Sequence, residues 1–271
     1  MNEFVEGSNS WWGEYSFEVE QIQSWVIGPI TLYIQRRVNE WIFAYERSDV
    51  SADITLGWEH KADISKIPRE YEQERYAFAE APSRIRLLPT LAGKQVITRP
   101  TVPFHLMPDE EVTVYAATPV WIKVETVQPK TKLTSIATRK LSKTWFGVST
   151  TKGELCYSTK TKCKIRIEEA PVSANRAVTP VRIKNLSPSQ IELNEINLPM
   201  PYLGLYLAPD GNLWTSPISI AREKKAEEVT ITFSKNPPDE MAQAELVTPP
   251  QKTWTGSVMK DAISSFFGES L

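Results

Sequence analysis

Few side chains in this chain have the types and spacing that metal chemistry needs. The sequence holds two histidines, His60 and His105, and neither has a second histidine or a cysteine at metal-ligand spacing. The segment PFHLMPDEE brings His105 near Glu110 and Glu111, but a strand histidine beside a solvated turn accounts for the same residues. The sequence therefore predicts no metal site and no cofactor.

Nucleophilic and nucleotide chemistry also lack a signature. Cys156 and Cys163 lie seven residues apart; in one continuous strand they would point to opposite faces, whereas a hairpin turn at 159–160 would let them approach. Cys156 follows Leu155 on a predicted strand, which suits a small buried hydrophobe better than a nucleophile. The sequence has no GxGxxG, GxxxxGK[ST] or HExxH motif, and adjacent acids such as Glu168 and Glu169 are common on any surface. We therefore predict no catalytic residues.

Basic residues concentrate in the segment 130–166, where Glu154 is the single acidic residue. Aromatic residues lie among them, a mixture that can bind single-stranded nucleic acid, phosphates or an acidic membrane surface. Alternating lysines also suit the solvent face or edge of a strand, where they discourage aggregation. If the segment binds polyanions, the predicted contacts are Lys140, Lys143, Lys160, Lys162 and Lys164.

The C-terminal segment 257–271 has apolar residues at helical spacing. Ser257 is a candidate N-cap, Gly268 a candidate stop, and the apolar positions fall on one face. Such a helix could dock on its own domain, join two copies of the chain, bind a partner or lie on a membrane surface. The predicted partner contacts are Trp145, Phe146, Ile263, Phe266 and Phe267.

Strands must position these residues, because most of the chain alternates apolar and polar side chains. The clearest hairpin joins 31–37 to 41–47. Short alternating runs continue to residue 233, interrupted by 61–80, which fits either a helix or a strand. Twenty prolines suit short strands and ordered turns better than long helices. The predicted fold class is all-β, with two β-sandwich domains of the jelly-roll or immunoglobulin-like kind and a C-terminal amphipathic helix.

Turn-forming residues near 171–175 predict a domain boundary, and two Pro-Pro pairs predict a linker. The expected divisions are an N-terminal β-sandwich at 1–170, a smaller one at 171–235, the linker at 236–252 and the helix at 253–271.

Composition sets the class of protein. The 271 residues are 41% hydrophobic and 24% charged, which is typical of a soluble globular protein, and the net charge of -2 disfavours a polyanion partner for the whole chain. No apolar run is long enough to span a membrane, and the acidic N-terminus is unlike a signal peptide. Two cysteines in so long a chain favour a reduced, cytoplasmic location.

Three passages resemble a known family: WWGEYSFEVE with GPITLYIQRRVNEWIFAYER, RPTVPFHLMPDEEVTVYAATPVWIKV, and TWFGVSTTKGELCYSTKTKCKIRI. They are similar to the prokaryotic proteins grouped as domain of unknown function 432, over about residues 11–235. The family carries no assigned activity, so the resemblance implies no catalytic residues. Its genes sometimes neighbour those of mechanosensitive channels, which implies a cytoplasmic accessory to a membrane protein.

Together these observations predict a non-enzymatic interaction or scaffolding module that binds a protein partner or associates with itself. Two alternatives stay open: a jelly-roll enzyme or binder of a carbohydrate-like ligand, and polyanion binding through residues 130–166. The sequence disfavours nucleic acid as a partner and leaves peripheral membrane contact open.

Overall fold

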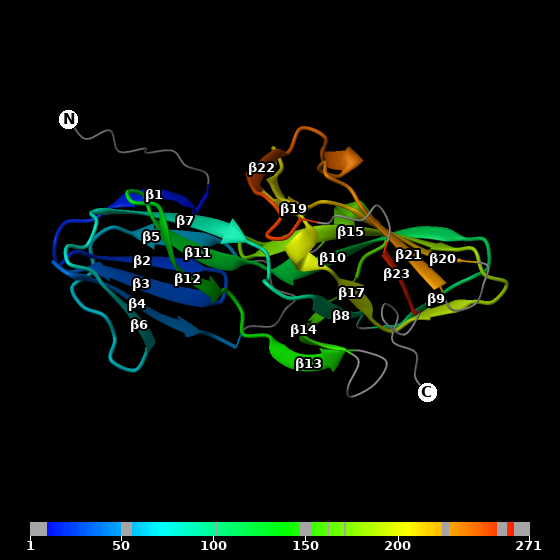
Figure 1. Ribbon diagram of the computed structural model, residues 1–271, viewed down its shortest axis with the longest axis horizontal. Coiled ribbons are helices and arrows are strands. Elements are labelled where there is room, and N and C mark those ends of the chain that lie inside the picture. The colour runs from blue at the N-terminus through cyan, green and yellow to red at the C-terminus, as the bar shows by residue number, and fades with distance from the viewer. Residues whose placement is uncertain are drawn as a thin grey trace. The chain divides into compact units, whose positions relative to one another are not determined.

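The computed structural model describes residues 10–49, 56–100, 102–146, 153–161, 163–170, 172–223, 228–253 and 259–262. Within these ranges the regular elements are β-strands and three single-turn 3-10 helices, η1 (Ile167–Glu169), η2 (Met200–Tyr202) and η3 (Asp239–Met241), with no α-helix (Figure 1). The predicted all-β class is therefore confirmed. No helix in the described ranges has the length and apolar character to cross a membrane.

The chain divides into two compact units. The first holds 1–90, 120–140 and 173–175, and the second holds 91–119, 141–172 and 176–271. This division differs from successive domains split at 170/171, because the chain passes repeatedly from one unit to the other.

The first unit contains two antiparallel sheets. The four-stranded sheet has the order β1 (Gly13–Ser16), β7 (Arg84–Thr90), β11 (Trp121–Thr126) and β12 (Thr131–Ala137). The five-stranded sheet has the order β5 (Trp58–Lys61), β2 (Ile22–Ile27), β3 (Ile30–Arg36), β4 (Glu40–Arg47) and β6 (Glu72–Ala77). The predicted hairpin is confirmed as β3 and β4, with Ile34 opposite Phe43. The ambiguous segment 61–80 supplies strand β6, because pairing with β4 satisfies its backbone.

Two kinds of contact join these sheets at their opposite edges. Near β1 and β5 the contact is aromatic, since the Tyr15 ring meets Trp25 edge-on at 4.9 Å between centroids. Near β12 and β6 it is polar: Thr134 Oγ1 donates to Glu74 Oε2 over 2.8 Å, and Arg47 Nε donates to the Ala137 carbonyl over 2.8 Å.

The second unit is built around a long antiparallel pair, β10 (Glu111–Pro119) and β15 (Arg176–Asn185), whose strands run side by side in Figure 1. The remaining strands of that sheet are β18 (Leu205–Leu207), β19 (Leu213–Thr215), β20 (Ile218–Arg222), β21 (Glu228–Phe233), β22 (Glu245–Thr248) and β23 (Met259–Ala262). A second sheet has the order β13 (Ser142–Phe146), β14 (Glu154–Thr161), β8 (Val96–Pro100) and β17 (Ile196–Leu198), and β9 (Phe104–Leu106) pairs with β16 (Ile191–Leu193).

A proline in the middle of β15 is accommodated by the pairing around it. Tyr115, opposite Pro180, exchanges backbone hydrogen bonds with Lys164 on the far side of β10. The backbone nitrogen of Pro180 therefore faces away from β10, toward the break between β19 and β20. At this break the parallel register with β15 shifts by one residue. A missing N–H costs least at such an irregularity.

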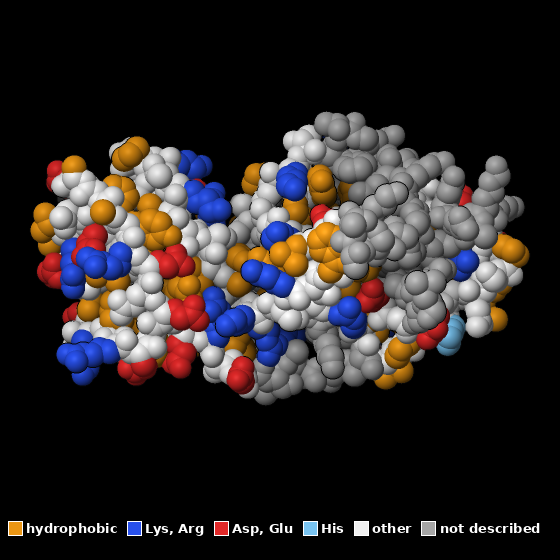
Figure 2. Space-filling view, turned by 60° about the horizontal axis from the view of Figure 1, so that its bottom comes forward, with side chains coloured by type: hydrophobic (Ala, Val, Ile, Leu, Met, Phe, Trp, Pro, Cys, Tyr) orange, Lys and Arg blue, Asp and Glu red, His pale blue; other side chains and the backbone are white. Residues whose placement is uncertain are grey.

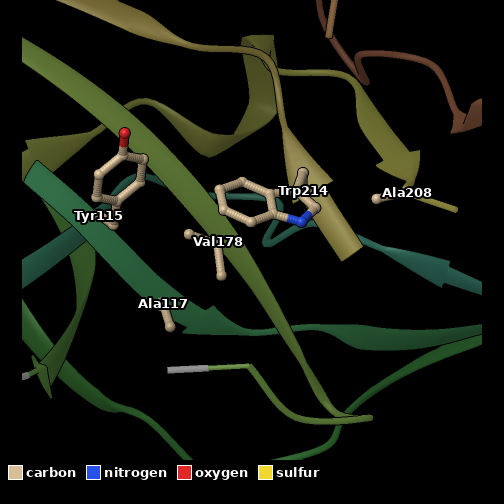
Figure 3. Close-up of a cluster of buried hydrophobic side chains, with 5 residues drawn as sticks. All are labelled: Tyr115, Ala117, Val178, Ala208 and Trp214. Carbon is tan, nitrogen blue, oxygen red and sulfur yellow. The ribbon is translucent and has the colours of Figure 1, made fainter. Parts of the chain in front are cut away.

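Large side chains from three adjacent strands fill part of the second unit's core. Tyr115 on β10, Val178 on β15 and Trp214 on β19 lie together, and the Tyr115 and Trp214 rings meet edge-on at 6.2 Å (Figure 3). The Tyr115 hydroxyl donates to Glu240 Oε1 over 3.2 Å. This bond ties η3, within the predicted linker, to the core.

The structure corrects the helix predicted near the C-terminus. Residues 259–262 form strand β23 paired with β21, so the predicted helix at 253–271 is wrong there; backbone pairing outweighs a spacing too short to distinguish helix from strand. Of the other residues in the predicted helix, the structure describes residue 253 alone. In the predicted linker, 245–248 form strand β22, which lies between the two Pro-Pro pairs. Its backbone is satisfied by hydrogen bonds to β18.

Candidate interaction surface

The most exposed aromatic–aliphatic pair described on a sheet lies on β13 and β14. Trp145 is opposite Leu155, and the two side chains are 49% and 41% exposed. Lys143, two residues before Trp145, is opposite Tyr157. Because side chains alternate across a strand, these four residues share one face, which we call the Trp145 face.

The opposite face of the same strands is anchored in the unit's interior. Thr144 is opposite Cys156, which is fully buried. Burial, followed by the charge of Glu154, raises the pKa of the Cys156 thiol to about 11, and burial raises that of Cys163 to about 12. Both thiols are free, and strand β14 runs without a hairpin turn at 159–160. The thiols are therefore protonated at neutral pH, which suits packing rather than nucleophilic attack.

β13 is an edge strand with little protection among the described residues. It pairs with β14 over five residues without a register shift, and no other described strand bonds to it. By contrast, β22 carries an irregularity in its pairing with β18, and β6 presents Glu72, Gln73 and Arg75 to solvent. Bulges and charges discourage pairing at an edge, whereas a regular strand with two aromatic residues invites it.

The predicted site residues do not gather in one place. Lys143, Trp145 and the half-buried Phe146 lie on β13. Lys140 is exposed in the first unit, and Lys164 forms an ion pair with Glu169 over 2.9 Å. The backbone of Lys160 lies in β14, and the structure does not describe its side chain. Outside the described residues altogether lie Lys162, Ile263, Phe266 and Phe267.

A different group of cations, missed from the sequence, lies on the four-stranded sheet. We call the outward side of this sheet the cationic face; its basic residues are Arg84, Arg86, Lys123, Lys130 and Lys132. Alternation in RIRLL and WIKVE could have indicated outward-facing charges, but only the register places Arg86 beside Glu125 and Glu125 beside Lys132. In the view of Figure 2, basic and acidic side chains are intermixed over the first unit, so the grouping rests on these strands.

A buried carboxylate organises the cationic face. The Glu125 side chain is 2% exposed, and its oxygens lie 2.6 Å from Lys123 Nζ, 3.4 Å from Arg86 Nη1 and 3.7 Å from Lys130 Nζ. Glu14 accepts hydrogen bonds from both Arg84 and Arg86. Burial alone would raise the pKa of Glu125, but the Lys123 hydrogen bond and the three positive charges outweigh burial and lower it. The carboxylate is therefore ionised at neutral pH and holds the cations in place.

A second organised carboxylate, Glu74, lies between β6 and β12. It accepts hydrogen bonds from the Tyr45, Tyr76 and Thr134 hydroxyls at 2.7 to 2.9 Å. Burial raises the pKa of Glu74, but these three bonds and Arg47 lower it overall. A carboxylate so fully bonded joins the two sheets rather than offering a free base. Among the described residues no group of three or more His, Cys, Asp or Glu side chains could hold a metal ion.

Comparison with known proteins agrees with the resemblance found in the sequence. The family model described as protein of unknown function DUF432 matches residues 11–267, nearly the whole chain. Neither the curated proteins nor the solved structures gave a match. The chain therefore belongs to the DUF432 family.

Proposed function

We propose that this protein is a non-enzymatic interaction module that binds an extended segment of a partner protein by adding a strand at β13. The observation that carries the proposal is that the exposed Trp145 face includes side chains of β13, an edge strand with a regular register. In strand addition, main-chain hydrogen bonds supply affinity and alternate side chains supply specificity. We also propose that the domains are β-sandwiches, as the sequence predicts, because two packed sheets would hold the edge strand β13 rigid.

The chemistry of the face defines the partner segment. Trp145 offers a large apolar surface, and Lys143 offers a positive charge two residues away, at a spacing of about 6.8 Å along the strand. A complementary segment is extended, with an apolar residue opposite Trp145 and an acidic residue two positions from it. The apolar contact dominates the affinity, because an exposed ion pair contributes about 0.2–1 kcal/mol.

Selection from a displayed library of random peptides of about twelve residues tests the proposal with the full chain as bait. The enriched peptides should alternate in polarity and pair an acidic residue with an apolar one at i, i+2. Repeating the selection on Lys143→Glu should replace the acidic residue by a basic one. The matched control is Trp58→Ala, because Trp58 is 37% exposed on β5, a strand of the first unit that is not part of the Trp145 face.

Peptides that bind Trp145→Ala as tightly as the unchanged protein would exclude this face as the recognition surface. Selections that give the same charge pattern on the Lys143→Glu variant would exclude the proposed register.

A further inference from the structure

The cationic face carries an excess of positive charge that its own carboxylates do not neutralise. Five cations lie with two carboxylates, Glu14 and Glu125, which leaves three net positive charges on one side of one sheet. The chain as a whole has a formal net charge of -2. The excess is therefore a local property of this sheet.

The excess charge points outward. Glu125 is buried beneath the cations, whereas the side chains of Arg84 and Lys130 are 52% and 67% exposed. Four of the cations lie on strands β7, β11 and β12, which span about 10 Å at the usual spacing between strands, and Lys130 lies in the turn just before β12. An approaching anion thus meets a preorganised array of positive charges rather than a single flexible lysine.

The form of this array selects among polyanions. Single-stranded nucleic acid is usually held by exposed aromatic rings on which bases stack. Trp121 lies on the same side of β11 as Lys123 and Glu125, but it is only 7% exposed. Because the aromatic ring described on this side of β11 is buried, the cations around it fit a flat array of phosphates better than they fit stacked bases.

We propose that the cationic face binds the phosphate groups of an anionic phospholipid surface. Three net charges give weak and reversible attachment, because stable anchoring needs a second signal. The attraction acts over a Debye length and falls steeply as salt rises. This surface is separate from the Trp145 face, so either proposal can fail without the other.

Co-sedimentation of the full chain with vesicles of phosphatidylglycerol and phosphatidylcholine tests the inference at low ionic strength. The variant Lys130→Gln/Lys132→Gln removes two exposed charges on the cationic face. Its matched control, Lys61→Gln/Lys66→Gln, removes two exposed charges on and just after β5. Each lysine near an anionic surface changes binding about fivefold, so the first pair should weaken binding about thirtyfold and the control less than about threefold.

Equal weakening by both pairs would overturn the proposal, because binding would then follow net charge rather than this face. Undiminished binding to vesicles of phosphatidylcholine alone would also overturn it. A single-stranded oligonucleotide that binds through Lys130 and Lys132 while vesicles do not would assign the face to nucleic acid instead. Melting curves of both variants that match the unchanged protein would show that lost binding is not lost folding.

Discussion

The Trp145 face and the cationic face present two different kinds of surface on strands. On β13 and β14 an apolar pair reaches solvent and the edge backbone follows a regular register. On β7, β11 and β12 charges reach solvent, held by a carboxylate buried beneath them. The first surface suits contact at short range with a strand, and the second suits attraction at longer range to an anion. Under the two proposals, one all-β scaffold carries two recognition modes, of which only the electrostatic one weakens strongly as the salt concentration rises.

The largest expected difference between the two surfaces is in how strongly salt weakens the binding of their ligands. Between about 0.01 M and 1 M salt the Debye length falls from about 30 Å to about 3 Å. Vesicle binding should fall more than about a hundredfold over this range, whereas binding of a selected peptide should change less than about threefold. Parallel titrations by sedimentation and calorimetry measure both. Equal salt dependence of the two ligands would contradict the division.

Truncating the aromatic side chain should break one surface and leave the other. Trp145→Ala should weaken binding of a selected peptide by about 2 kcal/mol, or about thirtyfold, because a large apolar contact is lost. Vesicle binding should not change. The control Trp58→Ala should leave both affinities within about twofold; a comparable loss in the control would show that a general destabilisation is being measured.

Removing the buried charge should destabilise the first unit. Glu125→Gln leaves Lys123 without its carboxylate, and we expect a loss of about 2 kcal/mol in the free energy of unfolding, a value reduced for the partly exposed cations. Urea unfolding measures this loss. The conservative Glu125→Asp should recover part of it, since a carboxylate is restored.

The same residue should set part of the acid sensitivity. The pKa of Glu125 is lowered in the folded state, so its contribution is present above the unfolded pKa of about 4.3 and is lost as pH falls through the lower folded value. The stability of the unchanged protein should therefore drop more steeply below about pH 4 than that of Glu125→Gln. Parallel slopes for the two proteins would contradict the ionised, paired state of this carboxylate.

The polar edge between β6 and β12 should give the smallest effect. Burial first, and then the hydrogen bond to Glu74, raises the pKa of Tyr45 to about 12. Because the folded state keeps this proton longer than the unfolded chain, stability falls as pH rises from about 10 toward 12. Tyr45→Phe should cost about 1 kcal/mol at neutral pH and flatten that alkaline decline, as alkaline unfolding curves would show.

Local alternation was enough to predict strands, since the hairpin of β3 with β4 follows from neighbouring residues. It could not predict which distant strands are neighbours, so the placement of Arg86 against Glu125 was missed. The same limit explains the C-terminal error, because the pairing of β23 with β21 depends on a partner about thirty residues away. Trp145 and Lys143 were proposed from their types, but their shared face depends on β14.

Hydrogen exchange of the full chain, with and without a selected peptide, tests the central claim most directly. We expect the peptide to slow exchange of backbone amides at 142–146, because an added strand engages the outer edge of β13. Residues 245–248, in the edge strand β22 that exposes Leu246, are the internal control and should not change. Slowed exchange at 245–248 without any at 142–146 would contradict the assignment of β13 as the recognition edge.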